Sequence, residues 1–207
     1  MAIPRFYPIL DTSLVERRGL DPVCTAAAIL EAGASILQYR CKGFFSRERY
    51  SELGRIAHLC EQSRAMLVVN DRADLACIFG AGLHLGQNDL LPSDARRVTG
   101  DRVTIGFSTH NEWQMRDAVS EPADYLAFGP IFATSSKQNP DPVVGLDDLR
   151  RIRSLTTRPL VAIGGITRSN ARSVIDAGAD SVAVIGDLYP EDGDVGARVR
   201  EWLKMVA

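Results

Sequence analysis

The chain reads Asp176-Ala177-Gly178-Ala179-Asp180-Ser181 just before an apolar run that ends at Ile185. Two other segments have the same order, Glu31-Ala32-Gly33-Ala34-Ser35 and Phe79-Gly80-Ala81-Gly82, and each also leads into an apolar run. A glycine in this place is typical of the end of a helix. The three segments therefore predict one repeated unit, in which a helix ends at a glycine and a short turn leads into a strand.

This unit can be followed through all 207 residues. Several of its apolar runs are continuous, as expected for strands that are buried on both faces. The predicted strands cover residues 6–10, 35–38, 66–70, 82–85, 103–107, 125–128, 160–163 and 181–185. The predicted helices cover residues 22–32, 46–63, 72–80, 93–99, 111–120, 146–156, 169–177 and 194–206.

Eight units of about 26 residues each are close to the lower size limit of an eight-stranded β/α barrel. We therefore predict an α/β protein with a single domain, a (β/α)8 TIM barrel over residues 1–207. The alternative is a doubly wound open sheet. It is disfavoured because the unit length stays even and no GxGxxG fingerprint follows the first strand.

Composition excludes several classes of protein. Lys and Arg number 24 against 26 Asp and Glu, which gives a net charge of −2 and disfavours a nucleic-acid binder. No apolar run approaches the roughly 20 residues of a membrane span, and the first residues lack the apolar core of a signal peptide. The four cysteines form no CxxC pair, so we expect small buried thiols and a cytoplasmic protein.

In a barrel of this kind the active site lies where the strands end, in the loops that follow them. After the second predicted strand, Gln38, Arg40 and Lys42 alternate and share one face of an extended chain, whereas Tyr39 and Cys41 face the helices. Two cations and an amide at the mouth predict a site for an anionic ligand. A solvated cluster of charges is the alternative.

Asp71 and Asp89 end the third and fourth predicted strands, which are neighbours in a barrel. Two carboxylates without His or Cys partners suit Mg²⁺, which keeps waters and takes phosphate oxygens of a substrate. The structural alternatives are a helix N-cap for Asp71 and a loop turn for Asp89.

Glycines follow the last two predicted strands, at Gly164, Gly165 and Gly186. Loops in these two places form a recurring phosphate site in such barrels, through backbone N–H groups. A phosphate is therefore predicted there.

The remaining aromatic side chains carry weaker signals. His84 is expected to be a core residue and His58 to lie at the surface, while His110 at the mouth suits proton transfer and a structural hydrogen bond equally. We expect Trp113 and Trp202 to pack helices.

Taken together and in order, these motifs resemble the thiamine-phosphate synthase family over essentially the whole chain. The matching motifs are Gln38-x-Arg40-x-Lys42, Asn70-Asp71-Arg72-x-Asp74-Leu75-Ala76, Gly82-Leu83-His84-Leu85-Gly86-Gln87-x-Asp89, Ser108-x-His110, Asp124-Tyr125-x-x-x-Gly129-Pro130-x-Phe132-x-Thr134-x-Ser136-Lys137 and Ala162-Ile163-Gly164-Gly165-Ile166.

The resemblance implies a Mg²⁺-dependent transferase that joins 4-amino-2-methyl-5-hydroxymethylpyrimidine diphosphate to a methylthiazole ethyl phosphate and releases diphosphate. It implies a catalytic set of Arg40, Lys42, Ser108 and Lys137, with Mg²⁺ on Asp71 and Asp89. The pyrimidine diphosphate set is Gln38, Tyr39, Arg40, Cys41, Lys42, Asn70, Ser108 and Lys137. The thiazole phosphate set is Thr134, Ser135, Ser136, Gly165, Ile185 and Gly186.

Three positions depart from the usual family pattern: Tyr39 replaces Leu, Ser136 replaces Thr, and Gly186 replaces Ser. Gly186 removes a hydroxyl donor and puts the affinity for the thiazole phosphate in doubt. Two other functions stay open: a thiazole tautomerase on the same barrel, and a phosphate-ligand sensor without catalysis. The expected partners are small phosphorylated molecules, with no nucleic acid and no membrane. A homo-oligomer, and a carboxylated form of the thiazole, are left open.

Overall fold

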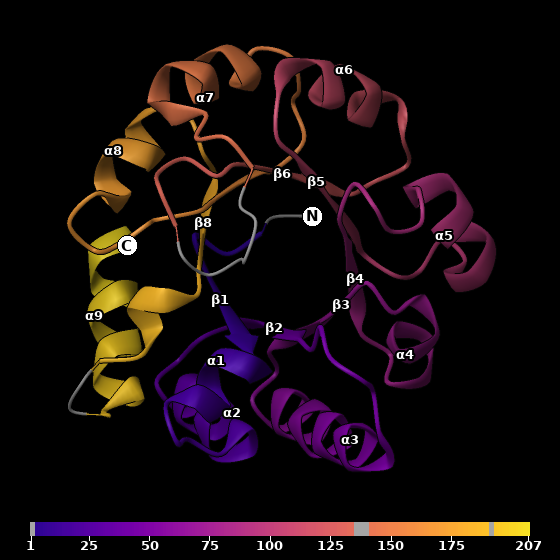
Figure 1. Cartoon of the computed structure of the whole chain (residues 1–207), viewed down its shortest axis with the longest axis vertical. Coiled ribbons are helices and arrows are strands. Elements are labelled where there is room, and N and C mark those ends of the chain that lie inside the picture. The colour runs from indigo at the N-terminus through magenta and orange to yellow at the C-terminus, as the bar shows by residue number, and fades with distance from the viewer. Residues whose placement is uncertain (1–2, 135–140, 191–192) are drawn as a thin grey trace.

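Eight parallel strands close into a barrel in a computed structural model of the chain, which describes residues 3–134, 141–190 and 193–207. Each strand pairs with the next along the chain, and β1 pairs with β8 to complete the ring (Figure 1). The strands are β1 Phe6–Asp11, β2 Ile36–Arg40, β3 Met66–Asn70, β4 Gly82–Leu85, β5 Ile105–Thr109, β6 Tyr125–Phe128, β7 Leu160–Ile163 and β8 Ser181–Val184. The predicted (β/α)8 barrel is confirmed, and the open-sheet alternative is wrong.

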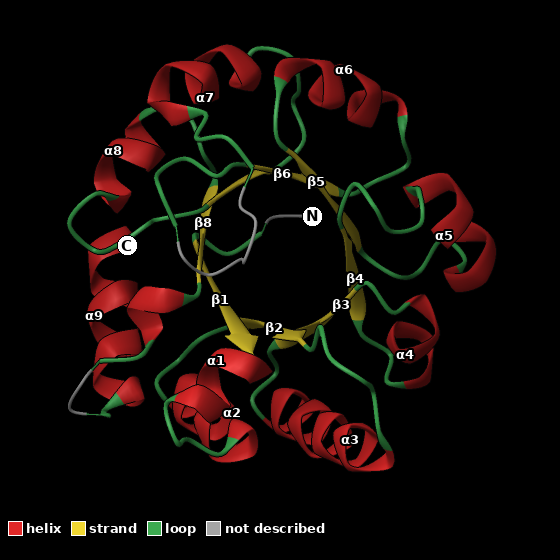
Figure 2. Ribbon diagram, in the orientation of Figure 1, coloured by secondary structure: helices red, strands yellow, loops and turns green. Residues whose placement is uncertain are grey.

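Helices surround the strands as an outer layer (Figure 2). They are α1 Thr12–Arg17, α2 Pro22–Glu31, α3 Arg47–Gln62, α4 Ala73–Ile78, α5 Pro92–Thr99, α6 Glu112–Ser120, α7 Gly145–Arg153, α8 Ala171–Asp176 and α9 Val195–Val206, with a short 3-10 helix, η1, at Gly186–Leu188. Helix α2 begins with a side-chain cap, since the Asp21 carboxylate accepts a hydrogen bond from the Cys24 backbone N–H and Pro22 follows it. Gly33 and Gly178 follow their helices with φ of 105° and 107°, which glycine adopts without strain.

Side chains alternate between two cores because successive strand residues point to opposite faces. One core lies inside the barrel and includes Tyr7, Ile36, Val68, Tyr125 and Val161. The larger core lies between strands and helices, where the Phe6 ring stacks on that of Trp202 at 5.5 Å between centroids. Inward-facing positions at the ends of the strands therefore line one mouth.

Several sequence expectations differ from the structure. Strands β2 and β5 end two residues later than predicted, and neither α1 nor η1 was expected. Trp202 is fully buried, as predicted, but Trp113 is 71% exposed because it lies on the outward face of the first turn of α6.

The expectation of buried thiols is also wrong in part. Cys60 is buried, but Cys24 on α2 and Cys77 on α4 are exposed on the outer helical layer.

No helix within the described residues is long and apolar enough to span a bilayer.

Candidate active site at the barrel mouth

The carboxyl ends of β2, β3, β4 and β5 bring most of the predicted polar residues to one edge of the barrel. Gln38 and Arg40 face inward from β2, where Gln38 is buried and its Nε2 donates to the Tyr7 hydroxyl at 3.0 Å. Arg40 forms an ion pair with Asp11 at the end of β1. The predicted alternation on β2 is thus confirmed.

Tyr39 and Cys41 face outward, as that alternation requires. The buried Tyr39 hydroxyl donates to Glu52 on α3 at 2.6 Å, and Cys41 packs against the outer core. Their side chains therefore do not reach the mouth, and any role in binding would pass through their backbone.

Lys42, Asp71 and Asp89 come together from three different loops. Lys42 Nζ lies 2.5 Å from Oδ2 of Asp71. Burial and the adjacent Asp89 carboxyl raise the pKa of Asp71 to about 6, although Lys42 acts in the opposite direction. An Asp71 carboxyl whose ionisation is opposed by burial and by a neighbouring acid is short of positive charge, and a divalent cation would supply it.

The structural alternatives for these two acids have different outcomes. Arg72, not Asp71, is the N-cap of α4, so the cap interpretation of Asp71 is wrong. Asp71 has a φ of 66°, which costs free energy in a residue with a side chain and is concentrated at functional positions. Asp89 does hold a turn, because one of its oxygens accepts from the Gly86 N–H at 2.8 Å.

The donor set of this pair fits Mg²⁺. Across the part of the chain that the structure describes, no group of three or more His, Cys, Asp and Glu side chains is arranged to hold a metal ion. The paired carboxylates are hard oxygen ligands, and Mg²⁺ characteristically takes one or two of them and completes its shell with water and phosphate oxygens.

Asn70 has an unused donor beside the acidic pair. This residue ends β3 and is 8% exposed, yet its Nδ2 has no hydrogen-bond partner among the described residues. A buried amide without a partner is costly, so an acceptor from a bound molecule would offset that cost.

The loops after β6 and β7 are packed backbone against backbone. The N–H groups of Ile131 and Phe132 donate to the carbonyls of Ile163 and Gly164 at 2.9 and 3.0 Å. A Cβ on Gly165 would lie 2.4 Å from the Ala133 oxygen, so this glycine is required by the neighbouring loop itself. The Gly165 position therefore brings Ala133, and with it Thr134, to the β7 edge.

The rest of the predicted thiazole phosphate set is only partly described. Ile185 packs against the inner core, and Gly186 begins η1, whose 3-10 geometry has a negative φ. Ser135, Ser136 and Lys137 lie outside the described residues.

His110 at the mouth makes structural contacts. Its Nδ1 donates to the Gly129 carbonyl at 2.6 Å, and its Nε2 lies 3.4 Å from an Asp141 oxygen. One ring thus bridges both sides of the loop that follows β6. His58 is exposed on α3 and His84 is a hydrogen-bonded core residue, both as predicted.

Sequence reasoning missed Asp11, Tyr7 and Tyr125. Asp11 could have been found, since it is the last residue of β1 and the same strand-end rule applies. Tyr7 carried no signal, because a tyrosine in an apolar strand is usually a packing residue. Tyr125 lies within one of the matching motifs but received no role for the same reason.

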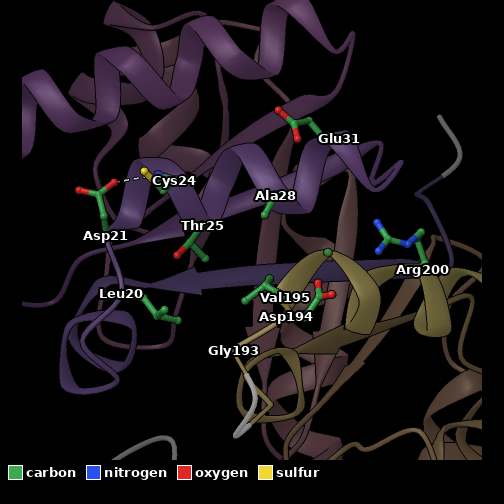
Figure 3. A pocket seen from close by; sticks show the side chains of 11 residues that line it. Leu20, Asp21, Cys24, Thr25, Ala28, Glu31, Gly193, Asp194, Val195 and Arg200 are labelled. Atoms are coloured by element: carbon green, nitrogen blue, oxygen red, sulfur yellow. Dashed lines mark hydrogen bonds between the residues drawn. The ribbon is translucent and has the colours of Figure 1, made fainter.

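A pocket of about 390 Å³ lies elsewhere, in the outer layer between α2 and the start of α9. Figure 3 shows Cys24, Asp194 and Arg200 among the side chains around it. None of the predicted site residues lines this pocket.

The closed barrel and its charged edge define a (β/α)8 protein with a site where barrel enzymes have theirs. Residues 6–188 match the family described as thiamine monophosphate synthase. The chain belongs to this family.

Individual relatives match this chain over more than nine-tenths of their own lengths. The chain is 48% identical to a thiamine-phosphate synthase of Koribacter versatilis, covering 100% of this chain and 97% of the relative. It is 39% identical to one of Chloroflexus aurantiacus, covering 98% and 93%. The solved structure of a thiamine phosphate pyrophosphorylase from Pyrococcus furiosus has a TM-score of 0.85 at 33% identity and covers 98% of this chain and 95% of that one.

Proposed function

We propose that this chain is a thiamine-phosphate synthase. It would join 4-amino-2-methyl-5-hydroxymethylpyrimidine diphosphate to 4-methyl-5-(2-phosphoethyl)thiazole, or to its carboxylated form, and release diphosphate. The observation that carries the proposal is the contact of Lys42, Asp71 and Asp89 at the mouth. Arg40 and the unsatisfied amide of Asn70 end the neighbouring strands β2 and β3. Cations, an unsatisfied amide and an acidic pair are together suited to a diphosphate with its metal ion.

The pyrimidine diphosphate would lie over the ends of β2, β3 and β5. Arg40 and Lys42 would exchange their carboxylate partners Asp11 and Asp71 for diphosphate oxygens. Asn70 would donate its free Nδ2–H, and Ser108 its hydroxyl. Lys137 would add a third cation from the loop after β6.

Asp71 and Asp89 would hold Mg²⁺, which when bound neutralises charge on the diphosphate leaving group. The cations of the chain act in the same sense. Arg40, Lys42 and Lys137 would stabilise the negative charge that grows on the diphosphate as its bond to the exocyclic CH₂ breaks.

The thiazole phosphate would lie over β6, β7 and β8. Thr134, Ser135 and Ser136 would offer hydroxyl donors, and Gly165, Ile185 and Gly186 backbone N–H groups. The thiazole nitrogen would then form a bond to the CH₂ from which diphosphate departs. No protein nucleophile is needed, so the mouth has to orient two substrates and keep water from the cationic carbon.

The binding partners would be small phosphorylated molecules, and the protein would be located in the cytoplasm.

The rival function is thiazole tautomerase, which moves a proton on one substrate and needs no acidic metal pair. The presence of Asp71 and Asp89 side by side favours the synthase. The two can be separated by incubating the thiazole phosphate with and without the pyrimidine diphosphate and Mg²⁺. A synthase gives thiamine phosphate and diphosphate only in the complete mixture, whereas a tautomerase gives neither product in any mixture. A sensor without catalysis gives no product in either.

A further inference from the structure

A chain of polar side chains crosses the inside of the barrel between two predicted ligand residues. Gln38 Nε2 donates to the Tyr7 hydroxyl at 3.0 Å, which lies 2.8 Å from the Tyr125 hydroxyl. The Tyr125 hydroxyl lies 3.0 Å from Nδ1 of His84, and His84 Nε2 lies 2.9 Å from Oγ of Ser108. Tyr7 and Tyr125 are 1% and 0% exposed, so water does not compete for these contacts.

This series of hydrogen bonds can cross the barrel because β5 carries no side chain at the same level. Gly106 on β5 is in register with His84 on β4 and with Tyr125 on β6. A Cβ on Gly106 would lie 2.0 Å from Cζ of Tyr125. The phenol therefore occupies the space in front of Gly106 and stacks on the His84 ring at 5.6 Å between centroids.

One consistent set of donors and acceptors begins at Gln38. Its Nε2 can only donate, so Tyr7 accepts it, and the Tyr7 hydrogen then has the Tyr125 hydroxyl as its acceptor. Tyr125 then donates to Nδ1 of His84, so the ring hydrogen lies on Nε2 and is donated to Ser108. The Ser108 hydroxyl hydrogen is thereby left to point to the mouth.

We infer that Tyr7, Tyr125 and His84 are positioning residues that make Ser108 a hydrogen-bond donor and Gln38 Oε1 an acceptor toward the bound pyrimidine diphosphate. The inference rests on the proposed function for the identity of that ligand. A diphosphate oxygen only accepts hydrogen bonds, so a serine that binds it must spend its hydrogen on the ligand. If the hydrogen bonds ran in the opposite direction, Ser108 would offer the diphosphate lone pairs instead of a hydrogen.

The two tyrosines are suited to this role because they keep their hydrogens. Burial raises the pKa of Tyr7 to about 12 and that of Tyr125 well above 10. Each therefore stays a neutral phenol that both donates and accepts at neutral pH.

The direction can be measured on the wild-type full chain without ligand. Nitrogen-15 NMR of the histidine rings distinguishes the two neutral tautomers, and the His84 signals are assigned by their loss in His84→Gln. We expect a hydrogen on Nε2 and none on Nδ1. A hydrogen on Nδ1, or an even mixture of both tautomers, would overturn the inference whether or not the protein makes thiamine phosphate.

A variant then tests the link to the ligand. Tyr125→Phe keeps the ring but removes the hydroxyl, and Tyr189→Phe removes another buried hydroxyl outside the chain as a matched control. For Tyr125→Phe we expect a mixed His84 tautomer and a KM for the pyrimidine diphosphate that rises about tenfold, the effect of one lost hydrogen bond. The KM for the thiazole phosphate should not move. A pure Nε2–H tautomer in Tyr125→Phe, or equal effects on both KM values, would contradict the positioning role.

Discussion

Lys42 Nζ lies 2.5 Å from Oδ2 of Asp71, although both residues are proposed to bind different parts of one substrate complex. A similar contact joins Arg40 to Asp11. In the protein without ligands, the cations proposed to bind the diphosphate are therefore paired with carboxylates. Binding of Mg²⁺ to Asp71 would release Lys42 toward the diphosphate, so the metal and the substrate should favour each other's binding.

The raised pKa of Asp71 predicts how Mg²⁺ binding depends on pH. The carboxyl titrates at about 6, and the metal has to displace its proton below that value. The Mg²⁺ concentration for half-maximal coupling should rise about tenfold for each pH unit below about 6, and stay level above about 7. Initial rates at a series of Mg²⁺ concentrations and pH values measure this. An equal Mg²⁺ requirement at both ends of the range would contradict the assignment of Asp71 as a ligand.

The same pKa predicts an effect on the stability of the metal-free protein. A carboxyl whose pKa is higher in the folded than in the unfolded chain contributes stability at low pH that is lost as the pH rises through about 6. Asp71→Asn removes the titration, and asparagine also tolerates the φ of 66°. Without Mg²⁺ the variant should melt above wild type at neutral pH and close to it near pH 4. Calorimetry at the two pH values decides, and a variant that melts lower at neutral pH would count against the raised pKa.

Charge on the acidic pair should be needed for turnover. Asp71→Ala and Asp89→Ala should each lower the coupling rate by at least about a hundredfold, the scale of losing a preorganised charge stabiliser. Asp89 also accepts from the Gly86 N–H, a contact that Asp89→Asn can keep. Asp89→Asn should therefore fall as far as Asp89→Ala in rate but remain closer to wild type in melting temperature. Wild-type rates in the Asp71 and Asp89 variants, together with full activity in EDTA, would remove the metal site.

Arg40 should act on one substrate only. Arg40→Ala removes a cation proposed for the diphosphate, so it should lower kcat and raise the KM for the pyrimidine diphosphate. Asp11, its partner in the free protein, can still cap α1 through the Leu14 N–H. Kinetics with each substrate varied in turn provide the check. A rise in KM confined to the thiazole phosphate would place Arg40 in the wrong half of the site.

Gly186 offers a test of the thiazole half. It begins the 3-10 helix η1, a geometry that serine adopts without strain, so Gly186→Ser should fold normally. The added hydroxyl can contribute at most roughly 1.5–3 kcal/mol through a charge-assisted hydrogen bond. We expect equal or modestly tighter binding of the thiazole phosphate in a calorimetric titration, with the KM for the pyrimidine diphosphate unchanged. Clearly weaker thiazole binding would show that Gly186 is not at the phosphate.

A substitution at Gly165 is expected to affect the fold as well as the binding of the thiazole phosphate. Its Cβ direction points to the Ala133 carbonyl, 2.4 Å away, rather than to open space at the mouth. Gly165→Val should therefore lower both the stability of the fold and the affinity for the thiazole phosphate. The effect on affinity alone cannot locate the phosphate.

The barrel and much of its mouth could be predicted because both follow from local order in the sequence. Continuous apolar runs between helices indicate parallel strands, and reading the residue after each run finds Arg40, Asn70, Asp71 and Asp89. The same reading applied to the first strand would have found Asp11.

The hydrogen-bonded side chains inside the barrel could not be predicted, because their meeting depends on which residues share a level of the barrel. Tyr7, His84 and Tyr125 come from three strands, and their meeting needs the register that places Gly106 between two of them. A one-residue change in that register would turn each side chain to the opposite face. The exposure of Trp113 could not be predicted either, because it depends on which face of the first turn of α6 points away from the core.

The most direct test of the proposed reaction is a ³¹P NMR time course with the wild-type chain, Mg²⁺, the pyrimidine diphosphate and the thiazole phosphate. We expect the pyrimidine diphosphate signals to be replaced by that of inorganic diphosphate and the thiazole phosphate signal by that of thiamine phosphate. The two products should form in equal amounts, and EDTA should stop the conversion. Diphosphate release without thiamine phosphate, or an unchanged spectrum, would contradict the assignment of this barrel as a thiamine-phosphate synthase.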